Sequence, residues 1–156
     1  MINTHSGSGY LETVAETRFT DFPRHRYLHF SQSLMYFEKA RFAVAKVSGI
    51  CEVLNRLMPG AEIAFVVIRV RLTMHKPIYL NQNGDYPYLR VRTWLVPAFC
   101  RLSFRQQIVG ASEDVLTEGF VDVAILVNGE LMRHFPQEVR DCLDRYEKEI
   151  SVRIAE

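Results

Sequence analysis

One stretch of the chain contains neither proline nor glycine and has apolar residues on nearly every side of a helix. It runs over residues 33–47, and Gly49 follows it as a C-terminal stop. A helix that is apolar on nearly all sides is expected to be buried on nearly all sides. The stretch therefore predicts the central helix of the core. Its charged side chains are Glu38, Lys39, Arg41 and Lys46.

The segments around this helix have the composition of β-strands. A weak alternation over residues 11–20 precedes it, and four β-branched or alternating runs follow at 64–76, 88–97, 101–109 and 115–127. A polar, exposed helix is expected over residues 137–149. One strand, a long buried helix and four strands in meander order predict an α+β fold, in which an antiparallel sheet wraps around the helix.

The length of 156 residues suits one domain. We expect residues 1–10 to form a flexible N-terminal tail, and residues 11–150 to form a single domain that includes the C-terminal helix. A sheet that covers only one helix leaves its edges exposed, so a homodimer or homotetramer is expected.

The net charge of +1 gives no reason to expect a nucleic acid or a membrane surface as a partner. No apolar run reaches the length of a membrane helix. Three widely spaced cysteines, with no secretory signal at the N-terminus, predict reduced thiols in a cytoplasmic protein. No metal site is expected, because the cysteines and histidines lack the spacing of zinc ligands.

The arginines of the expected sheet raise a question of charge. Pairing of the second and third strands through the turn at residues 81–85 would gather four arginines in one patch, which an anion or the carboxylates of Glu118 and Asp122 would have to balance. A solvated face balanced by these carboxylates is the preferred interpretation. The four arginines are Arg69, Arg71, Arg90 and Arg92.

Several titratable side chains lie in the loop that leads into the central helix. Asp21, His25 and His29 occur there together with Arg24 and Arg26. A carboxylate beside a helix N-terminus can serve hydrolysis, since it activates water while the helix amides polarise a carbonyl. The loop is also consistent with an ordinary turn in which Asp21 acts as a cap and the charged side chains have no catalytic role.

Five runs of the sequence carry a resemblance to a known family. RFTD (18–21), YFEKAR (36–41), KPIYLNQNGDYPYLRVRTWL (76–95), LSFRQQIV (102–109) and FVDVAILVNGELMRHFP (120–136) occur in the order and at the spacing of the 4-hydroxybenzoyl-CoA thioesterase-like family. The chain resembles this family over residues 18–136. The resemblance implies the hotdog fold and hydrolysis of an acyl-CoA or acyl-carrier-protein thioester. It implies no separate cofactor, since coenzyme A or phosphopantetheine belongs to the substrate.

The resemblance leaves two alignments of the loop. If FTD matches the end of the family's strand, Asp21 is the catalytic acid, the loop is two residues longer, and His29 corresponds to the loop histidine. If YFEKAR is extended without a gap, Pro23 and Phe30 fall on those two positions. We prefer the first alignment, because loops tolerate insertions.

Five further residues are expected to bind substrate. Ser33 stands where the family has a tyrosine near the helix start, Tyr27 would line the pocket, and Phe37 would contribute to an apolar wall. Arg24 and Arg26 are placed to meet a phosphate or the pantetheine arm. The displaced loop and the missing tyrosine also suit a non-hydrolytic acyl-thioester-binding protein of the same fold, whereas a hotdog dehydratase fits the sequence less well.

Overall fold

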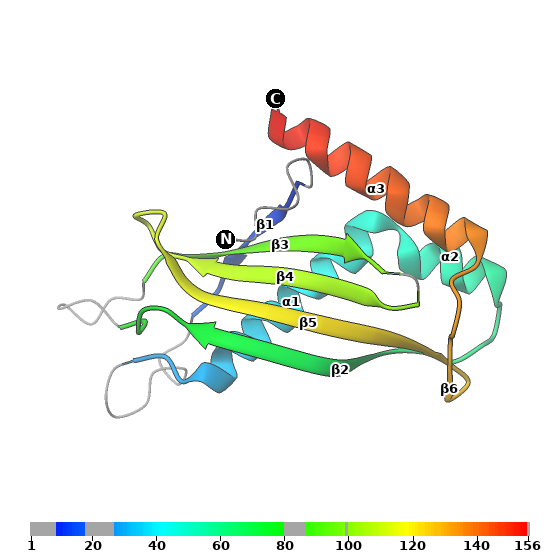
Figure 1. Ribbon diagram of the computed structural model, residues 1–156, viewed down its shortest axis with the longest axis horizontal. Coiled ribbons are helices and arrows are strands. Elements are labelled where there is room, and N and C mark those ends of the chain that lie inside the picture. The colour runs from blue at the N-terminus through cyan, green and yellow to red at the C-terminus, as the bar shows by residue number, and fades with distance from the viewer. Residues whose placement is uncertain (1–8, 18–26, 80–86, 99, 156) are drawn as a thin grey trace.

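A computed structural model describes residues 9–17, 27–79, 87–98 and 100–155 (Figure 1). The described chain contains helices and strands in mixed order, as expected for an α+β protein. In chain order the elements are β1 (Leu11–Ala15), α1 (Phe30–Ser48), α2 (Ile50–Leu57), β2 (Ile63–Met74), β3 (Leu89–Pro97), β4 (Leu102–Val109), β5 (Val115–Val127), β6 (Glu130–Leu131) and α3 (Gln137–Ala155).

The strands form one antiparallel sheet in the order β1-β3-β4-β5-β2, with the short β6 paired to β5. Figure 1 shows α1 running behind this sheet, at an oblique angle to its strands. The two observations confirm the predicted architecture of an antiparallel sheet wrapped around one long helix.

The predicted meander order is wrong for β2. Only β3, β4 and β5 follow one another in the sheet, whereas β2 pairs with β5 from Ile63↔Val127 to Met74↔Thr117. The predicted arginine patch is therefore wrong as well. Arg69 and Arg71 lie on β2, and two whole strands separate them from the β3 arginines.

Helix α1 begins at Phe30, three residues before the predicted start, because His29 caps it. His29 has an extended backbone, and its Nδ1 accepts a hydrogen bond from the Ser31 amide at 3.3 Å. At the other end Gly49 adopts φ 79° and donates its N–H to Lys46 O. The left-handed conformation explains why a glycine ends the helix.

The prediction that α1 is buried on nearly all sides holds for only part of its surface. Tyr36, Phe37, Ala40 and Val44 are buried. One side nevertheless remains open to solvent in the single chain, since the sheet and the other helices cover only the rest of the helix. Met35 and Phe42 are exposed apolar residues on this side, whereas Phe30 and Val47 are exposed near the two ends of the helix.

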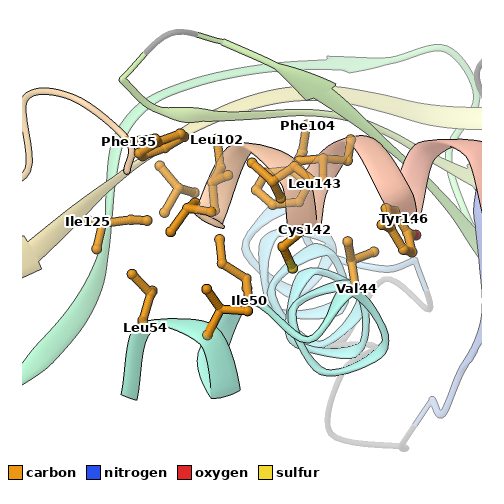
Figure 2. Close-up of a cluster of buried hydrophobic side chains, with 14 of the residues drawn as sticks. Val44, Ile50, Leu54, Leu102, Phe104, Ile125, Phe135, Cys142, Leu143 and Tyr146 are labelled. Carbon is orange, nitrogen blue, oxygen red and sulfur yellow. The ribbon is translucent and has the colours of Figure 1, made fainter. Parts of the chain in front are cut away.

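Helices α2 and α3 complete the core on the helix-bearing side of the sheet. Figure 2 shows α3 placing Cys142, Leu143 and Tyr146 against Ile50 and Leu54 of α2, with sheet residues on the other side. The predicted C-terminal helix is confirmed, but it is not fully exposed. Apolar residues recur on one of its faces at helical spacing, and that face is buried.

Candidate functional site

The sequence predicts a candidate site at the start of α1. Tyr27, His29 and Ser33 are among the described residues, whereas Asp21, Arg24 and Arg26 lie outside them, as does His25. The described part of the candidate site extends from Tyr27 through the first two turns of α1.

The chain enters α1 through a short contact with the segment after β2. Leu28 is buried, and its amide donates to Ile78 O at 2.7 Å. The neighbouring residues Tyr27 and Tyr79 form an isolated antiparallel β-bridge. Their rings are in an edge-to-face arrangement, with 6.2 Å between the ring centroids. Tyr27 is therefore held at the surface next to the helix start, where the sequence expected a pocket-lining residue.

The first turn of α1 presents amides and the positive end of the helix dipole. Two of these amides have partners, because Ser31 N donates to His29 Nδ1 and Gln32 N donates to His29 O at 2.9 Å. Ser31 Oγ also lies 2.8 Å from His29 Nδ1. His29 thus fixes the start of the helix through Nδ1, which leaves its other ring nitrogen for a ligand or a water molecule.

Ser33 is 1% exposed, and its Oγ has no hydrogen-bond partner among the residues that the structure describes. Thr117 of β5 is 0% exposed, and within the same described ranges its Oγ1 has no partner either. Buried hydroxyls are normally satisfied by protein or by ordered water, so these two hydroxyls leave room for a polar atom that the described residues do not supply.

The two hydroxyls belong to one layer between α1 and the sheet. Phe37 lies on Gly119, and Val44 shares a cluster with residues further along β5, so the helix and this strand run in the same direction. Ser33 lies about 6 Å before Phe37 along the helix axis. Thr117 lies about 6.6 Å before Gly119 along its strand, on the same face of the sheet.

Phe37 is fully buried between α1 and β5. It belongs to the cluster that packs beneath the helix start, together with Leu28, Ile78 and Ile108. Its ring therefore supports the first turns of α1 from inside the core.

A buried polar network links the middle of α1 to the sheet. Gln106 of β4 is 0% exposed, and its Nε2 donates to Phe37 O at 2.9 Å and to Thr93 Oγ1 at 3.1 Å. Its Oε1 accepts from Arg41 Nη1 at 2.9 Å. Arg41 therefore reaches Gln106 rather than forming the ion pair with Glu38 that their spacing of three residues suggests.

The outer face of the sheet carries arginines that have carboxylate partners. Arg90 and Arg92 both bond to Glu12 of β1 and to Glu113 of the turn after β4. Hydrogen bonds from the two arginines hold the pKa of Glu113 below its usual value. These β3 arginines form a link between β1 and the turn, not an open anion site.

The expected balance of the four arginines by Glu118 and Asp122 is observed only for Arg69, because the other contacts of these two carboxylates are to arginines of β4 and of the turn before it. Arg105 lies 3.3 Å from Glu118, and Arg101 lies 3.8 Å from Asp122, which is also 4.0 Å from Arg69. Arg71 stacks on Phe120, with its Cζ 4.9 Å from the ring centroid. The face is thus largely neutralised by its own carboxylates.

No group of three or more potential metal ligands occurs among the described residues. Within the same ranges, no helix combines the length and the apolar character that crossing a bilayer requires.

Gln106 and Thr117 were not predicted from the sequence. The sequence does contain a sign that Gln106 is buried and bonded. It follows Leu102 and Phe104 at the next inward position of an alternating strand, where a polar residue must find buried partners. For Thr117 there is no such sign, since threonine is common in strands on either face.

This architecture is similar to that of known proteins in solved structures, but not in sequence. No family model matches the chain, and no curated protein matches its sequence. Three similar solved structures are a DHNA-CoA thioesterase from Staphylococcus aureus, a thioesterase complexed with coenzyme A and Zn from Thermus thermophilus, and a hypothetical protein from Staphylococcus aureus in complex with CoA.

Their likeness to this chain extends over nearly the whole length of each protein. The first is 17% identical, covers 90% of this chain and 94% of its own, and has a TM-score of 0.70. The second is 19% identical, covers 92% and 98%, and has a TM-score of 0.69. The third is 8% identical, covers 94% and 89%, and has a TM-score of 0.74. The chain has the hotdog fold of thioesterases, as the resemblance predicted.

Proposed function

We propose that the protein hydrolyses an acyl thioester of coenzyme A or of an acyl carrier protein to a free acid and a thiol. The observation that carries this proposal is the fold, which the chain shares over most of its length with thioesterases. The start of α1 adds local support, because helix amides and the unpartnered Ser33 hydroxyl lie beside an apolar core there.

In the proposed reaction Asp21 acts as nucleophile or as the general base for water. Water adds to the carbonyl carbon, its proton passes to the carboxylate, the C–S bond breaks, and the leaving sulfur takes up a proton. Amides at the start of α1 and the Ser33 hydroxyl would stabilise the oxyanion. We propose that His29 orients the carbonyl or the water, since Nδ1 is engaged with the first turn.

We assign the remaining residues to the substrate arm. Arg24 and Arg26 would meet phosphates, Tyr27 would line the entrance from the surface, and Phe37 would support the acyl site from below. The two neighbours solved with coenzyme A support this donor, and delivery by a carrier protein is the other form of the same thioester.

We further propose that two copies associate through β2, which is an edge strand with several exposed apolar side chains. An unpaired edge of this kind invites pairing with a second chain. The exposed side of α1 would be covered in the same assembly. We also retain the cytoplasm as the site of action, which the free thiols of Cys51, Cys100 and Cys142 support. The β2 residues are Val66, Val67, Ile68, Val70 and Met74.

The alternative is a protein that binds acyl thioesters without hydrolysing them. It is favoured by Ser33, which replaces the tyrosine of the family at the helix start. A binding protein would retain intact acyl-CoA, whereas an enzyme would release the thiol.

The test is thiol release from a panel of acyl-CoA thioesters by the wild type, by Asp21→Ala and by the remote control Glu130→Ala. We expect the wild type and the control to hydrolyse at least one thioester, and we expect Asp21→Ala, folded by circular dichroism, to lose most of the rate. Equal rates in all three proteins would exclude Asp21 as the catalyst. Retention of intact thioester by the wild type would favour the binding protein.

A further inference from the structure

We infer that a second site, in a cavity beside the C-terminal half of α1, binds an apolar chain that ends in a carboxylate. The cavity measures about 360 Å³, which is within the range of small-molecule sites, and lies between α1, the start of α2 and strands β2, β4 and β5. We call it the Arg41 cavity. It is defined by Arg41, Phe42, Phe65, Leu102, Phe104 and Val123.

The wall of the Arg41 cavity is apolar over most of its surface. Leu102 and Phe104 of β4 and Val123 of β5 form the side against the sheet, and each is 5% exposed or less. Phe42 of α1 and Phe65 of β2 flank the opening. An aliphatic chain placed there would leave water for a hydrophobic surface, at about 25 cal/mol for each Å² buried.

Arg41 supplies the polar end of the site. Its guanidinium is half-buried and is held in place by the Nη1 bond to Gln106, which is itself fixed by Phe37 O and Thr93. A guanidinium has five N–H donors, and this bond uses one of them. The remaining donors can receive a carboxylate in the bidentate geometry that arginine favours.

The charge of Arg41 lacks a counter-ion in the described part of the chain. No carboxylate there forms an ion pair with it, and burial lowers its pKa more strongly than Glu38, one turn away, raises it. The other charged side chains of the wall, Glu38, Lys46 and Glu52, are exposed at the rim, where solvent screens them. A half-buried cation that has a neutral hydrogen-bond partner but no carboxylate partner among the described residues favours an anionic ligand.

The Arg41 cavity is distinct from the start of α1. Its described lining on α1 begins at Glu38, and none of Tyr27, His29 and Ser33 contributes to it. A free medium-chain carboxylic acid fits this placement, because it needs an apolar slot and one cation but no hydrolytic group. A second copy paired along β2 would roof the opening at Phe42 and Val67, which are both exposed in the single chain.

The test is calorimetric binding of octanoate and of octanol, which have the same chain length but differ in charge. The wild type is expected to bind octanoate at least about tenfold more tightly than octanol, since one charge-assisted contact is gained. Arg41→Met should lose this preference and bind the two ligands alike. Lys46→Gln, the matched control at the rim, should keep it.

A second variant guards against misfolding of Arg41→Met. Ala45→Trp fills the cavity from α1 without touching the Arg41–Gln106 bond, and it should abolish binding of octanoate. Equal affinity of the wild type for octanoate and octanol would overturn the inference. So would octanoate binding that survives Arg41→Met, or no binding at millimolar octanoate, as expected if a second copy fills the cavity. Thiol release does not enter this test, so its outcome is independent of the proposed hydrolysis.

Discussion

Phe37 of α1 lies so close to Gly119 of β5 that a Cβ atom at the glycine would fall 2.7 Å from Cε2 of the ring. Side chains in folded proteins essentially never approach at this distance, so Gly119 is required by the helix above it. Gln106 is the β4 residue paired with Gly119, and its side chain donates a hydrogen bond to Phe37 O. The contact sets how closely α1 approaches the sheet.

We expect Gly119→Ala to lower the free energy of unfolding by about 1–3 kcal/mol, because the added methyl forces a fully buried ring to move. Urea denaturation measures this change. In the Gly119→Ala/Phe37→Leu pair the loss should be less than the sum of the two single losses, since leucine leaves room for the methyl. Strict additivity would mean that the ring is not the obstacle.

Gln106→Leu should destabilise the protein by about 1–3 kcal/mol, because Arg41 and Thr93 each lose a partner in a dry layer. Gln107→Leu is the matched control. Gln107 is adjacent and also buried, but it faces the other side of the sheet and bonds to the partly exposed Glu118, so a smaller loss is expected. Thermal unfolding of the two variants compares them directly. Equal losses would argue against a special role for the Gln106 network.

The paired arginines make part of the stability depend on pH. The pKa of Glu113 is lowered in the folded state by hydrogen bonds from Arg90 and Arg92, from a usual value of 4.5. A lowered folded pKa contributes stability that is fully present above about pH 4.5 and is lost as the pH falls through the folded value. Glu113→Gln should therefore be less stable than the wild type at pH 7, and the gap should narrow below pH 4.5.

Urea unfolding at a series of pH values measures this gap. Glu62→Gln is the control, since Glu62 is exposed and shows no arginine partner among the described residues. It should leave the pH dependence unchanged. A constant gap between Glu113→Gln and the wild type across the series would contradict the assigned linkage.

Ile68 is 56% exposed on the β2 edge, and we expect Ile68→Lys to disrupt the proposed dimer, because a lysine resists burial in an apolar interface. Sedimentation velocity measures the change. Val14 of β1 is 61% exposed at the opposite edge of the sheet, and Val14→Lys should leave the dimer intact. The reverse result would place the interface on β1.

Local patterns of the sequence were enough to predict the elements. The run over residues 33–47, without proline or glycine, gave a helix, and the alternating runs after it gave strands, because periodicity acts over a few neighbouring residues. The start of α1 was placed three residues late, since the capping contact depends on the side chain of His29, a residue that rarely signals a helix start.

The candidate site could be predicted only in part. The resemblance located the start of α1 and named Ser33, but the buried Thr117 hydroxyl lies on a strand more than eighty residues away. Arg41 was recognised as a helix residue, whereas its cavity forms from elements that meet only in the folded chain. No local pattern carries that information.

The sequence by itself determined the fold class, the central helix and, through the order of its runs, the hotdog fold. Only the tertiary structure decided that β2 crosses to the far side of β5. That pairing separates Arg69 and Arg71 from Arg90 and Arg92, and leaves β2 as an exposed apolar edge. The physical reason is that strand composition encodes which face is buried, whereas the choice of neighbour depends on packing of the complete sheet around α1.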